Sequence, residues 1–230
     1  MPSPVNIADN IRQIQQKIAD YATKYQRNQQ DIKLLAVSKT RPAEDIRQAW
    51  LAGQRDFGES YLQEAVEKIA QLEQLDICWH FIGAIQSNKT RDIASHFSWV
   101  HSVDRYKIAQ RLSQQRDPQL PPLNICLQIN ISEEASKSGI GLAQLAALAN
   151  DIRQLPGLHL RGLMAIPAKA ETLEGQRSIF RRLREALADL NARGHQLDTL
   201  SMGMTNDMEA AIAEGATIVR IGTAIFGART

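Results

Sequence analysis

Lys39 directly follows the apolar run Leu34–Val37 and Ser38, and it precedes Thr40, Arg41 and Pro42. Consecutive apolar residues of this length are typical of a buried strand, and proline favours the first turn of a helix. Lys39 is therefore expected on a strand-to-helix turn, where α/β proteins often place their chemistry. Its amine can form a Schiff base with an aldehyde, or it can simply solvate the end of the strand. The residues alone leave both interpretations open.

Two glycine-containing turns near the end of the chain, SMGMTND and RIGTAIFG, are the second candidate. Barrel proteins frequently bind phosphate at such turns with backbone N–H groups. Gly203 and Gly222 would let the backbone approach an anion, and Ser201 and Thr223 would donate hydroxyl groups. Ordinary strand-end glycines are the alternative interpretation.

Arg220 lies inside the apolar segment TIVRIG. An unpaired buried charge is costly, so the guanidinium needs either a structural carboxylate or a ligand. A lysine, a phosphate cradle and this arginine together match the aldehyde, phosphate and ring nitrogen of pyridoxal 5′-phosphate. The residues thus indicate that cofactor as the candidate ligand.

Strand-like segments alternate with helical ones along the chain. The expected strands are 34–39, 56–60, 77–83, 99–104, 124–131, 158–166, 199–202 and 217–221. The expected helices are 43–52, 61–75, 87–95, 106–115, 142–154, 172–191, 207–213 and one from 223. Asn206 with Glu209 resembles a capping pair for the helix near 207. An apolar stripe at positions 7, 11, 14, 18 and 21 predicts a further amino-terminal helix.

Eight strand–helix units favour an α/β fold, a (β/α)8 TIM-like barrel formed by residues 1–230 as a single domain, over a doubly wound open sheet. The carboxyl ends of barrel strands form the working face. The residues expected there are Lys39, Glu59, Ser60, Gly83, Asp104, Asn130, 166–167, 201–203 and 220–222.

Composition excludes several classes of function. The net charge of +2, from 27 basic and 25 acidic residues, indicates neither nucleic-acid nor membrane-surface binding. No apolar run approaches a membrane span, and the start MPSPVNIADN does not resemble a signal peptide. Cys78 and Cys126 lie in apolar runs and are expected to be buried reduced thiols, which fits a cytoplasmic protein. The five histidines show no metal-binding spacing, so no metal is predicted; His80, within a strand, is expected to be a hydrogen-bonded core or rim residue.

Seven ordered motifs resemble the pyridoxal phosphate homeostasis protein family. They are LLAVSKT, FGES-YLQE, WHFIGAIQSNK, INIS-EEASKSG, RGLMAIPA, SMGMTNDMEAAI and VRIGTAIFG, and the resemblance covers about residues 32–229. The resemblance implies a modified (β/α)8 barrel with an extra amino-terminal helix, similar to the barrel domain of alanine racemase standing alone.

The resemblance also implies roles for individual residues. It makes Lys39 the Schiff-base lysine and places Ser201, Gly222 and Thr223 at the phosphate. It places Arg220 at the pyridine nitrogen. Arginine can only donate there, which leaves the ring unprotonated and a poorer electron sink.

Two positions depart from the usual pattern of the family. Ser60 stands where the family usually has asparagine, so its contact with the cofactor would have a shorter reach. Thr205 stands where serine is common, and it keeps the hydroxyl group.

The family is described as keeping the free cofactor and the linked amino and keto acids in balance, without established catalysis. Two-base racemisation needs a second base, which similar racemases take from a tyrosine in another domain; these 230 residues include no such domain. We therefore expect a monomeric binding protein, with pyridoxal phosphate-dependent apo-enzymes as possible acceptors of the cofactor. The alternatives are a small racemase or lyase that uses Lys39 as base, and a phosphate-binding barrel enzyme without pyridoxal phosphate.

Overall fold

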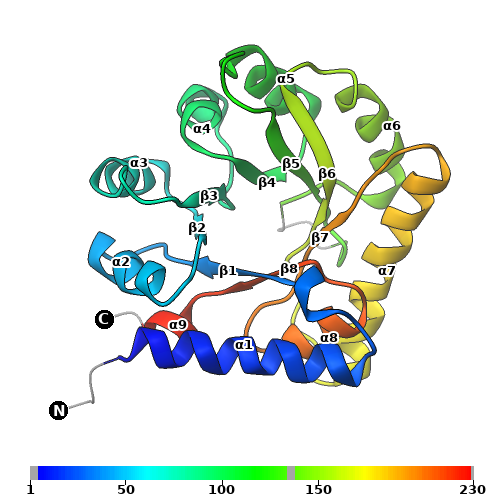
Figure 1. The fold of residues 1–230 in the computed structure, drawn as a ribbon. Helices are drawn as coiled ribbons and strands as arrows, with labels where there is room; N and C mark the ends of the chain where they lie inside the picture. The colour runs from blue at the N-terminus through cyan, green and yellow to red at the C-terminus, as the bar shows by residue number, and fades with distance from the viewer. Residues whose placement is uncertain (1–4, 134–137, 229–230) are drawn as a thin grey trace.

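Eight parallel strands close into a barrel in chain order in the computed structural model, which describes residues 5–133 and 138–228 (Figure 1). The strands are β1 (Lys33–Val37), β2 (Asp56–Glu59), β3 (Cys78–Phe81), β4 (Trp99–Val103), β5 (Leu123–Gln128), β6 (Leu158–Met164), β7 (Thr199–Ser201) and β8 (Ile218–Ile221). The pairing of β1 with β8 completes the barrel, so the predicted barrel is confirmed over the open sheet.

Helices follow the strands around the outside of the barrel (Figure 1). They are α1 (Ile7–Lys24), α2 (Ala43–Leu51), α3 (Leu62–Gln71), α4 (Thr90–His96), α5 (Tyr106–Gln115), α6 (Leu142–Ile152), α7 (Leu173–Ala192), α8 (Met208–Ala213) and α9 (Thr223–Phe226). Short 3-10 helices η1 (Gln29–Asp31) and η2 (Ser87–Lys89) precede β1 and α4. None of the helices in the described part of the chain combines the length and the apolar character that a membrane span requires.

The extra amino-terminal helix, α1, lies along one side of the barrel beside α8 and α9 (Figure 1). Its predicted stripe is buried at positions 7, 11, 14 and 18, with Ile11 fully so, whereas Tyr21 is half-buried. The Asn6 side chain caps the helix by accepting the Asp9 N–H, and Asn10 donates to the Ile225 carbonyl at 2.8 Å. These contacts fix α1 against the last helix of the chain.

Apolar side chains form two buried clusters. The larger one lies largely between strands and helices. The smaller one, which combines residues of five strands, consists of Leu35, Trp99, Cys126, Met164 and Ile218. Side chains alternate between the two faces of a strand, so a barrel has one apolar layer inside and another outside. Both cysteines are free thiols as predicted, although Cys78 is only half-buried.

Several predicted boundaries were wrong. β1 ends at Val37, not at Lys39, and β6 ends at Met164, before the expected 166. α3 ends at Gln71 and not at 75, and β5 ends at Gln128. Residues 134–137 of the INIS-EEASKSG motif lie outside the described residues.

The capping pair predicted for α8 was also wrong. Asp207 is the residue that precedes the helix, and its carboxylate accepts the Met204 N–H at 2.6 Å. The Glu209 carboxylate instead accepts hydrogen bonds from Lys24 and Tyr25 of the amino-terminal segment, at 2.7 and 2.9 Å. Tertiary contacts with α1 therefore outcompete the local cap.

Candidate functional site

Lys39 lies half-buried on a tight turn two residues beyond β1. The next residue, Thr40, has φ of 64°, a left-handed conformation that is strained for a β-branched residue. Its N–H donates to the Glu64 carboxylate of α3 at 2.6 Å. The turn that presents Lys39 is thus held in an unfavourable conformation by a neighbouring helix, an arrangement common at functional sites.

A buried polar cluster supports the residue before the lysine. The Ser38 hydroxyl donates to the Glu59 carboxylate at 2.6 Å, and the Lys68 ammonium contacts both the Ser38 carbonyl at 2.8 Å and Glu59 at 2.9 Å. Burial raises the pKa of Glu59, while the Lys68 charge and the Ser38 hydroxyl oppose that rise.

Lys68 was missed from the sequence. It lies on the same face of α3 as Ala65 and Leu72, which are both buried. A lysine inside an apolar helical stripe was the signal that a buried carboxylate lay opposite.

The end of β8 lies against the end of β1. Ala36 pairs with Ile221, and a Cβ added at Gly222 would lie 3.1 Å from the Val37 carbonyl oxygen. Thr223, which is exposed, begins α9, and the first N–H groups of a helix have no intrahelical acceptor. The structure therefore brings the second glycine turn beside the lysine turn.

The two glycine turns also meet each other. The Arg220 N–H donates to the Gly203 carbonyl at 2.9 Å. Gly203 has φ of 97°, and a Cβ there would lie 2.5 Å from the Ala211 side chain. Glycine is thus required at 203 by the backbone and by packing on α8, whatever ligand the turn binds.

Arg220 is buried, and neutral oxygens accept its hydrogen bonds. Its guanidinium donates to the Ser201 hydroxyl at 2.8 Å and to the Ala165 carbonyl at 2.9 Å. These partners are not the structural carboxylate that the sequence had left open. Burial lowers the pKa of Arg220 to about 10, and the negative charge of Asp207 counteracts part of that fall. The side chain remains a cation at neutral pH.

Ser201 is fully buried, and its hydroxyl contacts His101 Nδ1 at 2.7 Å in addition to Arg220. The side chain therefore lies in a polar chain within the barrel, and donation to a phosphate would compete with donation to His101. Ser60 is half-buried where β2 ends, and its carbonyl lies so close to Gly83 that a Cβ there would clash at 2.1 Å. The roles of Ser201 and Ser60 in cofactor binding stay predictions.

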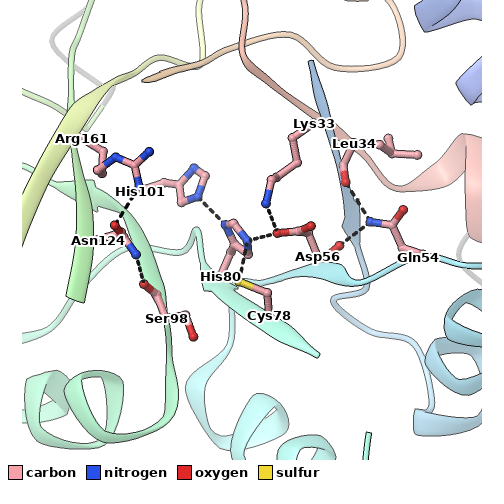
Figure 2. Close-up of polar contacts among 10 residues, drawn as sticks. All are labelled: Lys33, Leu34, Gln54, Asp56, Cys78, His80, Ser98, His101, Asn124 and Arg161. Carbon is pink, nitrogen blue, oxygen red and sulfur yellow. Dashed lines mark hydrogen bonds and ion pairs between the residues drawn. The ribbon is translucent and has the colours of Figure 1, made fainter. Parts of the chain in front are cut away.

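The polar chain continues from His101 to the other end of the strands. His101 Nε2 lies 2.9 Å from His80 Nδ1, and His80 Nε2 lies 2.8 Å from the Asp56 carboxylate, which also pairs with Lys33 at 2.7 Å (Figure 2). Burial lowers the pKa of both histidines. Burial raises the pKa of Asp56, but the hydrogen bonds and charges of His80 and Lys33 lower it below its usual value.

These ionisation states determine which atom donates in each hydrogen bond of the chain. An ionised Asp56 only accepts, so His80 Nε2 carries a proton and Nδ1 accepts from His101. His101 Nδ1 in turn accepts from the Ser201 hydroxyl. His80 is thus a hydrogen-bonded core residue, as the sequence predicted, but its connection to Arg220 was not foreseen.

A group of potential metal ligands also occurs among the described residues. Donor atoms of Asp56, Cys78 and His80 all lie within 4.8 Å of one another. Burial and the nearby Asp56 charge raise the pKa of the Cys78 thiol to about 11. The sequence has no metal-binding motif and therefore predicts that no metal binds.

Comparison with known proteins identifies relatives over nearly the whole chain. Residues 5–230 match the family described as "Alanine racemase, N-terminal domain". The chain is 60% identical to a "Pyridoxal phosphate homeostasis protein" of Pseudomonas aeruginosa over 97% of this chain and 96% of that protein. It is 54% identical to the protein of that name from Escherichia coli, over 97% of each chain.

Solved structures agree with these relatives. PipY of Synechococcus elongatus with pyridoxal phosphate bound superposes with a TM-score of 0.80 at 39% identity, covering 91% of this chain and all of that one. Alanine racemase from Corynebacterium glutamicum superposes with a TM-score of 0.69 at 16% identity, over 96% of this chain and 59% of the racemase. The latter similarity concerns the fold alone.

Proposed function

This chain belongs to the pyridoxal phosphate homeostasis protein family, and we propose that it binds pyridoxal 5′-phosphate through Lys39 and keeps this cofactor in balance inside the cell. The observation that carries the proposal is the 60% identity to a pyridoxal phosphate homeostasis protein over almost the full length of both chains. The 39% identical PipY structure with bound pyridoxal phosphate supports the same ligand. We further propose that the protein keeps the amino and keto acid pools linked to this cofactor in balance.

The geometry at the carboxyl ends of β1, β7 and β8 fits the cofactor. Gly222 approaches the β1 backbone closely, so Thr223 and the start of α9 lie beside the strained Lys39 turn. We assign phosphate binding to the turns that contain Ser201, Gly203, Gly222 and Thr223. When bound, the cofactor supplies an aldehyde for the lysine amine and a ring that can withdraw electrons.

Arg220 is assigned to the pyridine nitrogen. Since neutral oxygens accept two of its hydrogen bonds, its positive charge is not cancelled by a directly bonded carboxylate. A guanidinium only donates hydrogen bonds, so it would leave the ring nitrogen unprotonated and restrain catalysis. Ser60, at the end of β2, is assigned a weaker contact.

The first experiment tests Lys39. Reduction of the cofactor-loaded protein with borohydride, followed by peptide mass analysis, is expected to place a pyridoxyl group on Lys39. Lys39→Ala is expected to abolish the Schiff-base absorption but to leave the melting temperature of the cofactor-free protein unchanged, because a half-buried rim lysine contributes little packing.

Lys169→Ala is the matched control, since Lys169 is an exposed lysine in the segment after β6. It should retain both the adduct and the absorption. An adduct on another lysine, or no adduct at all, would contradict the assignment. No adduct would also favour the alternative of a phosphate-binding enzyme without pyridoxal phosphate.

A second experiment separates a carrier from an enzyme. The loaded protein is incubated with a panel of amino acids, and the products are counted per mole of protein. A carrier gives at most one equivalent, whereas multiple turnovers would identify a racemase or lyase. Incubation with apo-enzymes that require pyridoxal phosphate then tests delivery, which we expect to activate them. We place this activity in the cytoplasm, which fractionation of cells would check.

A further inference from the structure

We propose that Asp56, Cys78 and His80 form a binding site for a divalent transition-metal ion, with Zn²⁺ as the best chemical fit. The site lies on β2 and β3, where Asp56 and Cys78 begin the two strands (Figure 2). Lys39 lies beyond the carboxyl end of β1. The metal site is separate from the proposed cofactor site and does not depend on it.

Strand register brings the three ligands together. Asp56 pairs with Cys78 across β2 and β3, and His80 lies two residues further along β3. Because side chains alternate along a strand, Cys78 and His80 share one face. The ligands therefore lie on paired barrel strands and not on a mobile loop.

The donor atoms are close to the separation that Zn²⁺ requires. With bonds of about 2.0–2.3 Å in tetrahedral geometry, neighbouring donors lie about 3.3–3.8 Å apart. Cys78 Sγ already lies 3.5 Å from His80 Nε2. The Asp56 carboxylate is 2.8 Å from the same nitrogen, so it must move away by about half an ångström.

Ligand chemistry selects the class of metal. A thiolate and an imidazole favour Zn²⁺ and similar transition metals, whereas Mg²⁺ and Ca²⁺ prefer oxygen donors alone. Coordination replaces the thiol proton and the His80 Nε2 proton by the metal. One proton is released to water from sulfur, and the imidazole shifts its proton to Nδ1.

The surroundings of His80 accommodate that shift. With Nδ1 protonated, His80 donates to His101 Nε2. His101 must then move its own proton from Nε2 to Nδ1 and donate it to the Ser201 hydroxyl, so both contacts persist with reversed direction. The ring is also stacked on Trp99, with centroids 5.5 Å apart and 9° between the planes. Such outer contacts orient metal-binding histidines.

The Lys33 ammonium shows that a cation can bind beside Asp56, and it would compete with the metal ion for that carboxylate. The ammonium contacts the Asp56 carboxylate at 2.7 Å, yet 42% of the Lys33 side chain is exposed, so it can swing aside. Lys33 and Asp56 line an open cavity of about 570 Å³ together with Gln54, Gln30 and Gln15. Of the three ligands, Asp56 lines this cavity, so a hydrated metal ion would reach its carboxylate first.

The test uses the purified full-length protein after treatment with a chelator. Zn²⁺ alone is titrated by calorimetry, and Co²⁺ alone is followed by its visible d–d bands and its thiolate charge-transfer band. One equivalent is expected to bind, with a tetrahedral cobalt spectrum.

Variants move the affinity in opposite directions. Cys78→Ser should weaken Zn²⁺ binding by at least about tenfold and remove the charge-transfer band. Lys33→Met should strengthen binding by about tenfold, because it removes a competing cation. Cys126→Ser is the matched control, since Cys126 is a fully buried thiol that is not part of the donor group, and it should leave the affinity and spectrum unchanged.

Two outcomes would overturn the proposal. One is that the wild-type protein binds no Zn²⁺ or Co²⁺. The other is that a bound metal retains the same affinity and spectrum in folded Cys78→Ser and in Lys33→Met, which would locate it elsewhere. Circular dichroism of each variant establishes that it is folded, and Lys33→Met, which changes a partly exposed side chain, keeps the test decisive if Cys78→Ser unfolds.

Discussion

Lys68 shows how a single residue couples packing to the lysine turn. Its side chain is 6% exposed, and its ammonium contacts the carboxylates of Glu59 and Glu64 and the carbonyl of Ser38, the residue before the lysine turn. A buried ion pair contributes little net stability, but loss of one partner leaves an uncompensated charge. The position of Lys39 and the stability of the barrel therefore depend on the same ammonium group.

Lys68→Met is expected to lower the free energy of unfolding by about 3–5 kcal/mol, because it leaves the Glu59 carboxylate buried without its cation. Urea unfolding at neutral pH measures the loss. The double variant Glu59→Gln with Lys68→Met should recover most of it, since no charge is then buried.

Lys24→Met provides the surface comparison for this prediction. Lys24 pairs with Glu209, but its side chain is 58% exposed, so we expect a much smaller change in the free energy of unfolding. Equal losses in the single variant Lys68→Met and in the double variant would show that the ion pair is not the cause.

At the scale of elements, three arginines of α7 hold the end of α8. Arg177, Arg181 and Arg184 approach the buried Glu214 carboxylate at 2.9, 3.2 and 2.7 Å. Burial raises the pKa of Glu214, but these hydrogen bonds and charges lower it below its usual value overall. Because the pKa of Glu214 is lower in the folded protein than in the unfolded chain, its ionised carboxylate stabilises the fold at pH values above the pKa in the unfolded chain. This contribution is lost as the pH falls through the pKa in the folded protein.

Glu214→Gln is therefore expected to cost about 1.5–3 kcal/mol at pH 7, as for hydrogen bonds to a charged group. The difference from wild type should shrink below about pH 4, where glutamate is protonated in the unfolded chain. Chemical unfolding at a series of pH values measures both. Glu174→Gln, at a 69% exposed partner of Arg181, should change little; a difference for Glu214→Gln that is independent of pH would contradict the ionic interpretation.

The contact between β6 and β7 depends on one glycine. A Cβ at Gly162 would lie 1.8 Å from the Thr199 carbonyl oxygen. Gly162→Ala is expected to cost more than about 3 kcal/mol, because the backbones must separate. Gly141→Ala is the control, since a Cβ there meets no atom within 4 Å. Thermal melting of both variants checks this, and similar melting temperatures would show that the strands can yield.

At the scale of the whole molecule, the barrel separates two chemical ends. The lysine turn and the glycine turns lie at the carboxyl ends of the strands, and the metal ligands lie at the amino ends. The chain Asp56–His80–His101–Ser201–Arg220 joins the two through the interior. Hydrogen bonds thus connect the metal ligands at the amino ends to Arg220, which is assigned to the pyridine nitrogen at the carboxyl ends.

The molecule is predicted to be a monomer in solution. A single barrel of nearly balanced charge gives no reason for self-association. Sedimentation equilibrium should return a mass near 25.7 kDa with and without cofactor. A mass twice as large across the concentration range would contradict this prediction.

The sequence by itself determined the barrel, the amino-terminal helix and the position of Lys39 on the turn that follows the first strand. These follow from local patterns, because apolar periodicity, proline and glycine act within a few residues. The strained conformation of Thr40 could not be predicted from the sequence, because Glu64 of another element holds this β-branched residue in the left-handed region. The false cap at Asn206 has a similar origin, because Glu209 finds its partners about 185 residues away.

Only the tertiary structure decided which polar residues meet. Lys68 joins Glu59, and His80 joins His101 and Asp56, through strand register and helix packing that no local spacing encodes. Cys78 and Asp56 face each other for the same reason. Patterns along a chain predict which elements form, but the closure of a barrel determines which of their side chains share the interior.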